Sequence, residues 1–273
     1  MHNHSTNHIE QRVAIAFNGQ SLIFDQIYSD DIVINYKRSR VREHLLKYLK
    51  AESKILELNA GTGEDAIFLA KLGHSVHATD ISSGMLEKLE EKVLSHRLAD
   101  SVTSELCSYT QLDNLKNKGP FDCIFSNFAG LNCTGDLDVV LSSFGNLLNP
   151  GGIVVLVILP AFCMWESLLL FKGKFKTATR RLFSAGGRRA NIDGASFTCW
   201  YYSPDYVVRN LKGKFETTEI EGLCTFVPPS YIEKFPVKHP KLYSFLCRVE
   251  NRLKTKWPWR NIGDYYIISL RRK

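Results

Sequence analysis

The sequence predicts an α/β protein that contains a parallel βαβ unit near the start of the chain. The apolar run at 55–58 is typical of a short buried strand, and Gly61 and Gly63 mark a tight turn directly after it. From residue 66 to 72 apolar side chains recur at helical spacing, and a second strand is expected at 75–78. Strand, glycine turn, helix and strand together make one βαβ crossover.

The crossover brings the glycine turn and an acid to the same edge of the sheet. The helix is expected to end at Gly73, and the second strand ends at Asp80. Glycine lets a ligand approach the backbone closely, and a carboxylate can accept both hydroxyls of a ribose. The simpler alternative is a turn with no ligand and an Asp80 that only caps the next helix. The turn and the acid together favour a nucleotide site.

The residues around the turn indicate which kind of nucleotide binds. A dinucleotide site requires a third glycine, and the chain has Glu64, Asp65 and Ala66 after Gly63. A pyrophosphate would also meet the negative charges of Glu57, Glu64 and Asp65. The sequence therefore favours a cationic ligand.

Several segments resemble class I S-adenosylmethionine-dependent methyltransferases, and among them a bacterial-type subgroup that acts on small molecules. The segments are "LELNAGTGEDAIFLAKLGHSVHATDISSGML" for the first two motifs, "GPFDCIFSNFAGLNC" for the fourth strand, "LLNPGGIVVLVI" for the fifth, and "IFDQIYSDDIVINYKRSRVREHLLKYL" for the amino-terminal helices. The resemblance implies a Rossmann-like, seven-stranded, mostly parallel sheet with an antiparallel carboxyl-terminal strand, helices on both faces and an inserted lid. The runs at 215–223 and 264–272 are expected to form its last two strands.

The resemblance also implies S-adenosylmethionine as the cofactor. Residues of the turn and the strand ends are expected to contact it: Glu57, Asn59, Ala60, Gly61, Gly63, Asp80, Ile81, Met85, Ser108, Tyr109, Asn127 and Phe128. Asp80 is expected to bind the ribose hydroxyls, and Ile81 and Met85 to flank the adenine. The family often has an acid at the end of the third strand for the adenine amine. This chain has Ser108 there, so the Ser108 hydroxyl and the Tyr109 backbone are expected to serve instead.

The predicted domain organisation has three parts. Residues 1–50 form an amino-terminal helical cap over the cofactor, 51–159 and 203–273 form the methyltransferase core, and 160–202 form an inserted lid. The lid begins with the apolar "PAFCMWESLLLF" and continues with a basic stretch that has no acid between Lys172 and Arg189. Such a stretch is often only a solvated face, and a subsite for an anionic acceptor or a contact with a phospholipid surface are the alternatives.

An insertion after the fifth strand lies over the strand ends where open α/β sheets bind ligands. The lid is therefore expected to shape the acceptor pocket with aromatic walls and a basic rim: Trp165, Phe171, Trp200 and Tyr201 for the walls, and Arg180, Arg181, Arg188 and Arg189 for the rim.

Methyl transfer by in-line displacement needs alignment and exclusion of water more than it needs a base. Five side chains are candidates for a general base, and none is favoured: Tyr28, Tyr36, Glu166, Tyr202 and His239. A protein of the same fold that binds cofactor without transferring methyl groups is the rival interpretation.

Composition fits an enzyme of this size. With 273 residues, 44% of them hydrophobic, the chain can bury a full core. No apolar run reaches membrane-spanning length and the amino terminus lacks a signal-peptide core, so we expect a cytoplasmic protein. The seven cysteines contain no Cys-x-x-Cys pair, and we expect no metal. His2, His4 and His8 are expected to lie in a disordered polar terminus.

The expected partner is a small-molecule acceptor. The net charge of +7 keeps nucleic acid open as an acceptor, but the chain has no recognisable RNA-binding module. The end of the fourth strand reads Ser126-Asn127-Phe128-Ala129, where enzymes that methylate amino groups of bases have Asn-Pro-Pro-Tyr. Peripheral membrane contact and the oligomeric state stay open.

Overall fold

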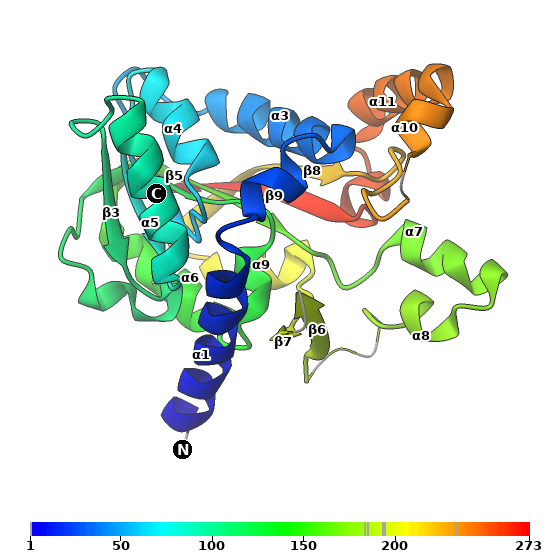
Figure 1. The fold of residues 1–273 in the computed structure, drawn as a ribbon, viewed down its shortest axis with the longest axis horizontal. Helices are drawn as coiled ribbons and strands as arrows, with labels where there is room; N and C mark the ends of the chain where they lie inside the picture. Colours follow the sequence, from blue (N-terminus) through cyan, green and yellow to red (C-terminus); the bar gives the residue numbers. More distant parts are fainter. Residues whose placement is uncertain (1, 183, 185, 193–194, 233) are drawn as a thin grey trace.

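A seven-stranded sheet in the order β3-β2-β1-β4-β5-β9-β8 forms the centre of the computed structural model, which describes residues 2–182, 184, 186–192, 195–232 and 234–273 (Figure 1). The strands are β1 (Lys54–Leu58), β2 (Ser75–Asp80), β3 (Val102–Leu106), β4 (Phe121–Ser126), β5 (Leu148–Ile158), β8 (Phe215–Leu223) and β9 (Tyr265–Arg272). β9 runs antiparallel to both β5 and β8, and the other neighbours pair in parallel. The predicted fold class is confirmed.

Helices cover both faces of the sheet, which is why its central strands are almost continuously apolar. α3 (Ile32–Leu46), α4 (Glu64–Lys71) and α5 (Ser83–Ser95) cover one face, and they pack on Ile55 and Phe125. η1 (Tyr109–Asn114), α6 (Leu137–Leu147) and α9 (Pro204–Leu211) cover the other face.

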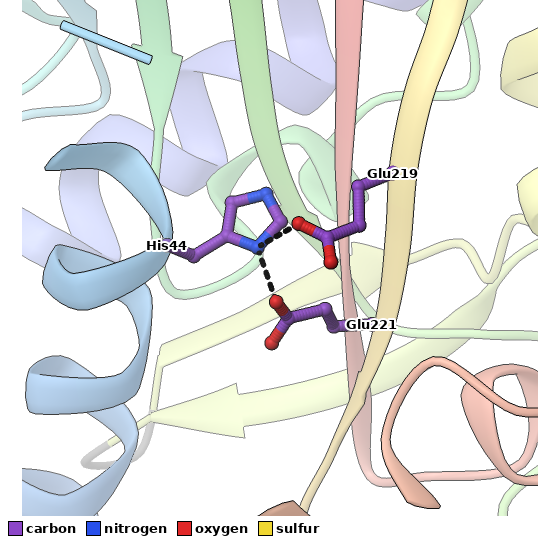
Figure 2. A group of neighbouring side chains, drawn as sticks. All are labelled: His44, Glu219 and Glu221. Carbon is purple, nitrogen blue, oxygen red and sulfur yellow. Dashed lines mark ion pairs between the residues drawn. The ribbon is translucent and has the colours of Figure 1, made fainter. Parts of the chain in front are cut away.

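Buried ion pairs join α3 to β8 (Figure 2). The Glu221 side chain is fully buried, and its carboxylate lies 2.9 Å from His44 Nδ1, 2.7 Å from Lys47 Nζ and 2.9 Å from Lys254 Nζ. Arg40 pairs with the same carboxylate at 3.0 Å. Burial raises the pKa of Glu221, but the hydrogen bonds and charges of these partners outweigh it and hold the pKa well below its ordinary value. The network fixes α3 on the sheet.

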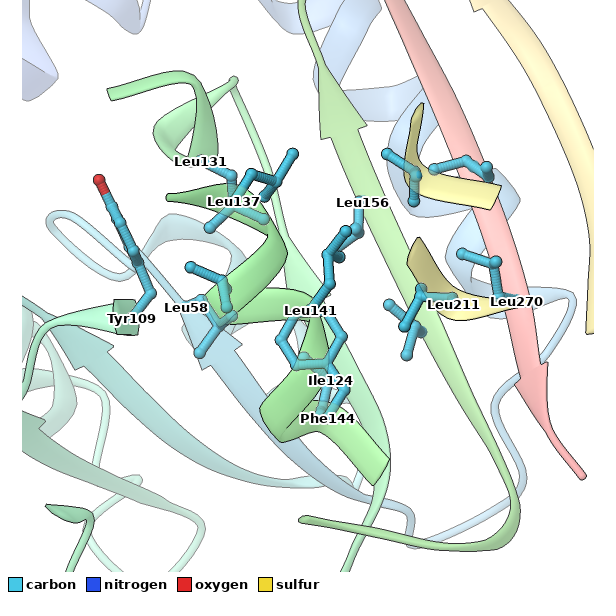
Figure 3. Packing of buried hydrophobic residues seen from close by; sticks show 14 of the residues in the cluster. Leu58, Tyr109, Ile124, Leu131, Leu137, Leu141, Phe144, Leu156, Leu211 and Leu270 are labelled. Atoms are coloured by element: carbon cyan, nitrogen blue, oxygen red, sulfur yellow. The ribbon is translucent and has the colours of Figure 1, made fainter. Parts of the chain in front are cut away.

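The opposite face holds a large apolar core (Figure 3). Leu58, Ile124 and Leu156 from three parallel strands meet Leu141 and Phe144 of α6 there. The side chains alternate between faces along each strand, so Ile55 packs under α4 and Leu56 under α6.

The amino-terminal segment forms α1 (His2–Gln20) and α2 (Phe24–Tyr28) before α3. The expectation of a disordered terminus was wrong, because the backbone is helical from His2 onward. α1 contacts α5 and the inserted hairpin. Asn18 Oδ1 accepts hydrogen bonds from Ser82 Oγ and Gly84 N–H, and Thr62 Oγ1 donates to Asp25 at 2.6 Å. The segment is therefore tied to the loops that follow β1 and β2.

The inserted segment 160–202 has a helical part and a hairpin. The helical part contains α7 (Met164–Ser167), η3 (Leu168–Lys172) and α8 (Phe175–Ala178), and the hairpin pairs β6 (Arg188–Ile192) with β7 (Ala195–Cys199). The Met164 N–H donates to the Ile262 carbonyl at 2.9 Å. The helical part therefore packs on the connection before β9, at the right in Figure 1, while β7 faces α1.

The connection between β8 and β9 contains α10 (Phe235–Lys238), α11 (Pro240–Leu253) and η4 (Trp259–Asn261). The buried Glu250 carboxylate of α11 accepts the N–H groups of Cys224, Phe226 and Val227 at 2.9–3.0 Å, which fixes the helix beside the end of β8. In the part of the chain that the structure describes, no helix combines the length and the apolar character needed to cross a membrane.

Candidate functional site

The two glycines of the turn after β1 have different roles. Gly61 has φ +56°, and a Cβ added there would meet nothing within 4 Å, so this position leaves open space above the backbone. Gly63 has φ +80°, and its Cβ would lie 2.6 Å from Leu89 Cγ. The second glycine thus lets α4 and α5 pack closely, and the first leaves room for a ligand.

Asp80 closes the turn from the end of β2. Gly61 N–H donates to its Oδ2 at 2.9 Å, and Ser82 N–H donates to its Oδ1 at 2.8 Å. Burial raises the pKa of this carboxyl, and the hydrogen bonds from Ser82 and Gly61 oppose the shift. Each carboxylate oxygen has a second lone pair, so the group can still accept bonds from a ligand.

Glu57 is a buried acid, and one of its carboxylate oxygens lacks a hydrogen-bond partner in the described chain. It is 3% exposed, and its Oε2 has no hydrogen-bond partner among the described residues. Burial and the neighbouring Asp65 carboxylate raise the pKa of Glu57 well above its ordinary value, although Arg42 opposes them. A cationic ligand would supply the missing partner.

A cavity of about 400 Å³ runs along the carboxyl ends of the strands from β2 to β9. Ten of the twelve predicted cofactor residues line it: Glu57, Asn59, Ala60, Gly61, Asp80, Ile81, Met85, Tyr109, Asn127 and Phe128. Gly63 and Ser108 do not line it. The Ser108 hydroxyl donates to Glu10 of α1 at 2.7 Å, so an acid from another element stands beside the position where β3 lacks one.

The covering elements add side chains that sequence reasoning missed. α1 and α2 contribute apolar walls, β7 contributes two residues, and α3 contributes two cations: Val13, Phe17, Phe24, Phe197, Cys199, Lys37 and Arg38. For α3, the sequence did carry a signal, because residues 23–49 resemble the helices that close over the cofactor in the family. No local pattern indicates that β7 reaches the same cavity.

Tyr28 lines the cavity, unlike the other four base candidates. Tyr36 donates to Glu250 of α11 at 3.1 Å, and burial followed by the Glu250 charge raises the pKa of Tyr36. Tyr202 donates to the Thr134 carbonyl.

The remaining two candidates are held by other contacts. Glu166 is 1% exposed and binds Arg180 and Arg181, which lower its pKa against the effect of burial. His239 is exposed at the start of α11, with its ring 5.3 Å from the Phe235 ring.

None of the eight predicted acceptor residues from 165–201 lines the cavity. Arg181 is 3% exposed and binds Glu166 and Asp264, with its guanidinium over the Tyr201 ring. Phe171 is 88% exposed to solvent. These residues lie outside the cavity because the helical part of the insertion packs on the connection before β9, where the buried ion pairs of Arg181 hold it. The rest of the predicted set, Trp165, Arg180, Trp200, Arg188 and Arg189, likewise lies outside the cavity.

Two clusters have the residue types of a metal site: His44, Glu219 and Glu221 (Figure 2), and Cys163, Glu166 and Asp264. In both clusters protein cations already pair with the carboxylates, namely three basic side chains around Glu221 and two arginines around Glu166. Both arrangements are those of ion-pair networks.

Residues 55–152 match the family model described as "Methyltransferase domain". The uncharacterized methyltransferase sll0829 of Synechocystis sp. is 28% identical over 149 residues, 53% of this chain and 66% of that protein, so the match spans just under two thirds of that relative.

Two solved structures share the fold. Geranyl diphosphate C-methyltransferase from Streptomyces coelicolor A3(2), in complex with Mg²⁺, geranyl diphosphate and S-adenosyl-L-homocysteine, has a TM-score of 0.57 at 15% identity over 86% of this chain and 79% of that one. Burkholderia thailandensis 1,6-didemethyltoxoflavin-N1-methyltransferase, with bound 1,6-didemethyltoxoflavin and S-adenosylhomocysteine, has a TM-score of 0.58 at 14% identity over 98% of this chain and 90% of that one. Residues 55–152 are therefore a methyltransferase domain, and the chain has the fold of the class I S-adenosylmethionine-dependent methyltransferases.

Proposed function

We propose that the protein transfers a methyl group to an oxygen or nitrogen atom of a small-molecule acceptor. The observation that carries this proposal is a continuous cavity that joins the glycine turn and Asp80 to a chamber walled by Phe17, Phe24 and Phe197. α1 and β7 cover this chamber, and a covered apolar chamber fits a small molecule better than a nucleic acid strand.

The residues at the turn fit the cofactor. Glu57 Oε2 is a buried acceptor without a partner, which suits the cofactor's ammonium group. Asp80 would bind the ribose hydroxyls, Ile81 and Met85 would flank the adenine, and Asn127 would lie beside the sulfonium. When bound, the cofactor supplies an electrophilic methyl group on that sulfonium.

The chain's own contribution to the reaction is alignment and exclusion of water. Apolar walls from α1 and β7 would keep water from the reacting atoms, and a phenol, carboxylate or amine acceptor would need little help from a base. Tyr28 is the one base candidate in the cavity, where its ring lies 4.8 Å from the Phe24 ring. Tyr28→Phe should bind cofactor normally, and normal turnover in this variant would indicate that no base acts there.

The rival function is a cofactor-binding scaffold that transfers no methyl group. Incubation of the protein with methyl-labelled S-adenosylmethionine and a protein-free cell extract separates the two. Label in a small-molecule product supports the enzyme, whereas cofactor binding without transfer to any fraction supports the scaffold. Label that enters only added RNA would support the less favoured RNA methyltransferase.

The exposed tip of the insertion supports a separate proposal about location. Phe171 and Phe175 are 88% and 65% exposed, and Lys174 and Lys176 lie next to them. Exposed aromatic and basic side chains together suit a peripheral contact with an anionic lipid surface.

A further inference from the structure

Two consecutive residues of α3, Lys37 and Arg38, bring positive charge to the cavity. Lys37 is 3% exposed, and the Arg38 side chain is 13% exposed. The cofactor contains one carboxylate, so it can neutralise only one of the two. Their surroundings indicate which one.

Arg38 lies beside the cofactor turn. Its Nη1 is 3.9 Å from Glu64 Oε2 at the start of α4, and its guanidinium carbon is 5.2 Å from the centre of the Phe128 ring. Its Nε is buried and has no hydrogen-bond partner in the described chain. Arg38 is therefore placed to bind the carboxylate of the cofactor.

Lys37 lies farther along the sheet. Its ammonium is 4.7 Å from the centre of the Tyr265 ring at the start of β9 and 3.9 Å from Asp264 Oδ2. β1 and β9 are three strand spacings apart, or roughly 14 Å. Lys37 therefore marks the end of the cavity that is remote from the glycine turn.

The Lys37 ammonium lacks a close counter-charge. Among the described residues it has no hydrogen-bond acceptor, and its one ion pair is the 3.9 Å contact with Asp264. Asp264 Oδ1 already binds Arg181 Nη2 at 2.8 Å. Burial lowers the pKa of Lys37, but Tyr265 and Asp264 raise it by more, so the side chain is a fixed cation at neutral pH and not a base.

The ion pairs around Lys37 form a chain with a cation at each end. Lys37 pairs with Asp264, Asp264 with Arg181, Arg181 with Glu166, and Glu166 with Arg180. Three cations thus face two carboxylates. The Arg180 end is 44% exposed and meets water, whereas the Lys37 end meets the cavity. An anion that enters the cavity would balance the excess charge at the Lys37 end.

We propose that the methyl acceptor is an organic anion whose carboxylate or other oxyanion is bound by Lys37 at the β9 end of the cavity. Arg181 and Glu166 act as positioning residues, since they hold Asp264 against Lys37. The inference rests on the proposed small-molecule methyl transfer and adds the charge of its acceptor.

The test begins with the wild-type protein. A protein-free cell extract is separated on an anion exchanger at pH 8, and each fraction is incubated with methyl-labelled S-adenosylmethionine. The fraction that supports label transfer should be retained by the exchanger. Transfer only with the unretained fraction overturns the inference and leaves the proposed function standing. Transfer with no fraction refutes the proposed function, and the inference with it.

Matched variants then assign the charge to Lys37. Lys37→Met should raise the acceptor KM at least tenfold while its Kd for S-adenosylhomocysteine, measured by calorimetry, stays within twofold of wild type. Lys37→Arg, which keeps the charge, should recover part of the lost affinity. The neighbour Arg38→Met should show the reverse pattern, a weakened Kd for S-adenosylhomocysteine. An unchanged KM in Lys37→Met, or a loss of S-adenosylhomocysteine binding there, would overturn the assignment.

Discussion

Replacing Glu57 by glutamine should stabilise the ligand-free protein and weaken its binding of cofactor. The carboxyl is 3% exposed, one of its oxygens has no partner in the described chain, and its pKa is raised well above the ordinary value of 4.5. Glutamine keeps the shape and removes the charge. The cost of burying the ionised group disappears with it.

The magnitude follows from the charge that is removed. Each unit by which burial raises the pKa of a carboxyl costs about 1.4 kcal/mol once the group is ionised, so Glu57→Gln should raise the free energy of unfolding by at least about 1.4 kcal/mol at pH 7.5. The pH dependence has a definite sign. Because the folded pKa is raised, the folded state holds its proton while the unfolded state has lost it, from pH 4.5 up to the folded pKa. In that window the free energy of unfolding of the wild type falls by about 1.4 kcal/mol for each unit by which the pH rises. The variant has no ionisable group at this position, so this fall is absent.

Urea unfolding of both proteins at pH 5 and pH 7.5 measures the difference, which should be larger at pH 7.5. Glu64→Gln is the matched control in the same turn. The Glu64 side chain is 43% exposed and pairs with Lys92 at 2.6 Å. Loss of this ion pair should lower the free energy of unfolding by about 0–1 kcal/mol, so Glu64→Gln should not stabilise the protein. Calorimetry should also show about tenfold weaker S-adenosylhomocysteine binding in Glu57→Gln, from about 1.5 kcal/mol for a hydrogen bond to a charged group. A Glu57→Gln protein less stable than wild type at pH 7.5 would refute the reasoning, because the carboxylate would then have a favourable partner.

Three further changes test other parts of the structure. Asp80→Ala should lower S-adenosylhomocysteine affinity in calorimetry, and unchanged binding would exclude Asp80 from the ribose site. Glu221→Gln should lower the free energy of unfolding in urea by about 3–5 kcal/mol at pH 7, because it leaves buried cations without their carboxylate. Glu216→Gln, at an exposed position of the same strand, should leave the free energy of unfolding nearly unchanged. The Glu221 contribution should fade as the pH falls below 4.5, since its folded pKa is depressed. Replacing Phe171 and Phe175 by serine should reduce sedimentation with anionic phospholipid vesicles and leave S-adenosylhomocysteine binding unchanged; equal sedimentation would exclude the insertion tip as a lipid contact.

The corrections concern long-range placement. The arginines of the insertion have no acid near them in sequence, which suggested a free basic rim. In the folded protein Arg181 meets Asp264, 83 positions later in the chain, and is buried. No periodicity within 160–202 carries information about that partner. The same limit explains why Lys37 was missed, since its neighbours Tyr265 and Asp264 come from the other end of the chain.

The βαβ unit, the class of sheet and the residues that follow its strands could be predicted from local sequence, because they depend on apolar periodicity, glycine conformation and the fact that parallel strands end at one edge. The position of Glu57, Gly61 and Asp80 around one cavity follows from that rule. The elements that cover the cavity and the places of its charges depend on tertiary packing. α1, β7 and the start of β9 meet there across more than two hundred residues, and the burial and ion pairs that place Lys37 at the cavity depend on contacts that no local pattern specifies.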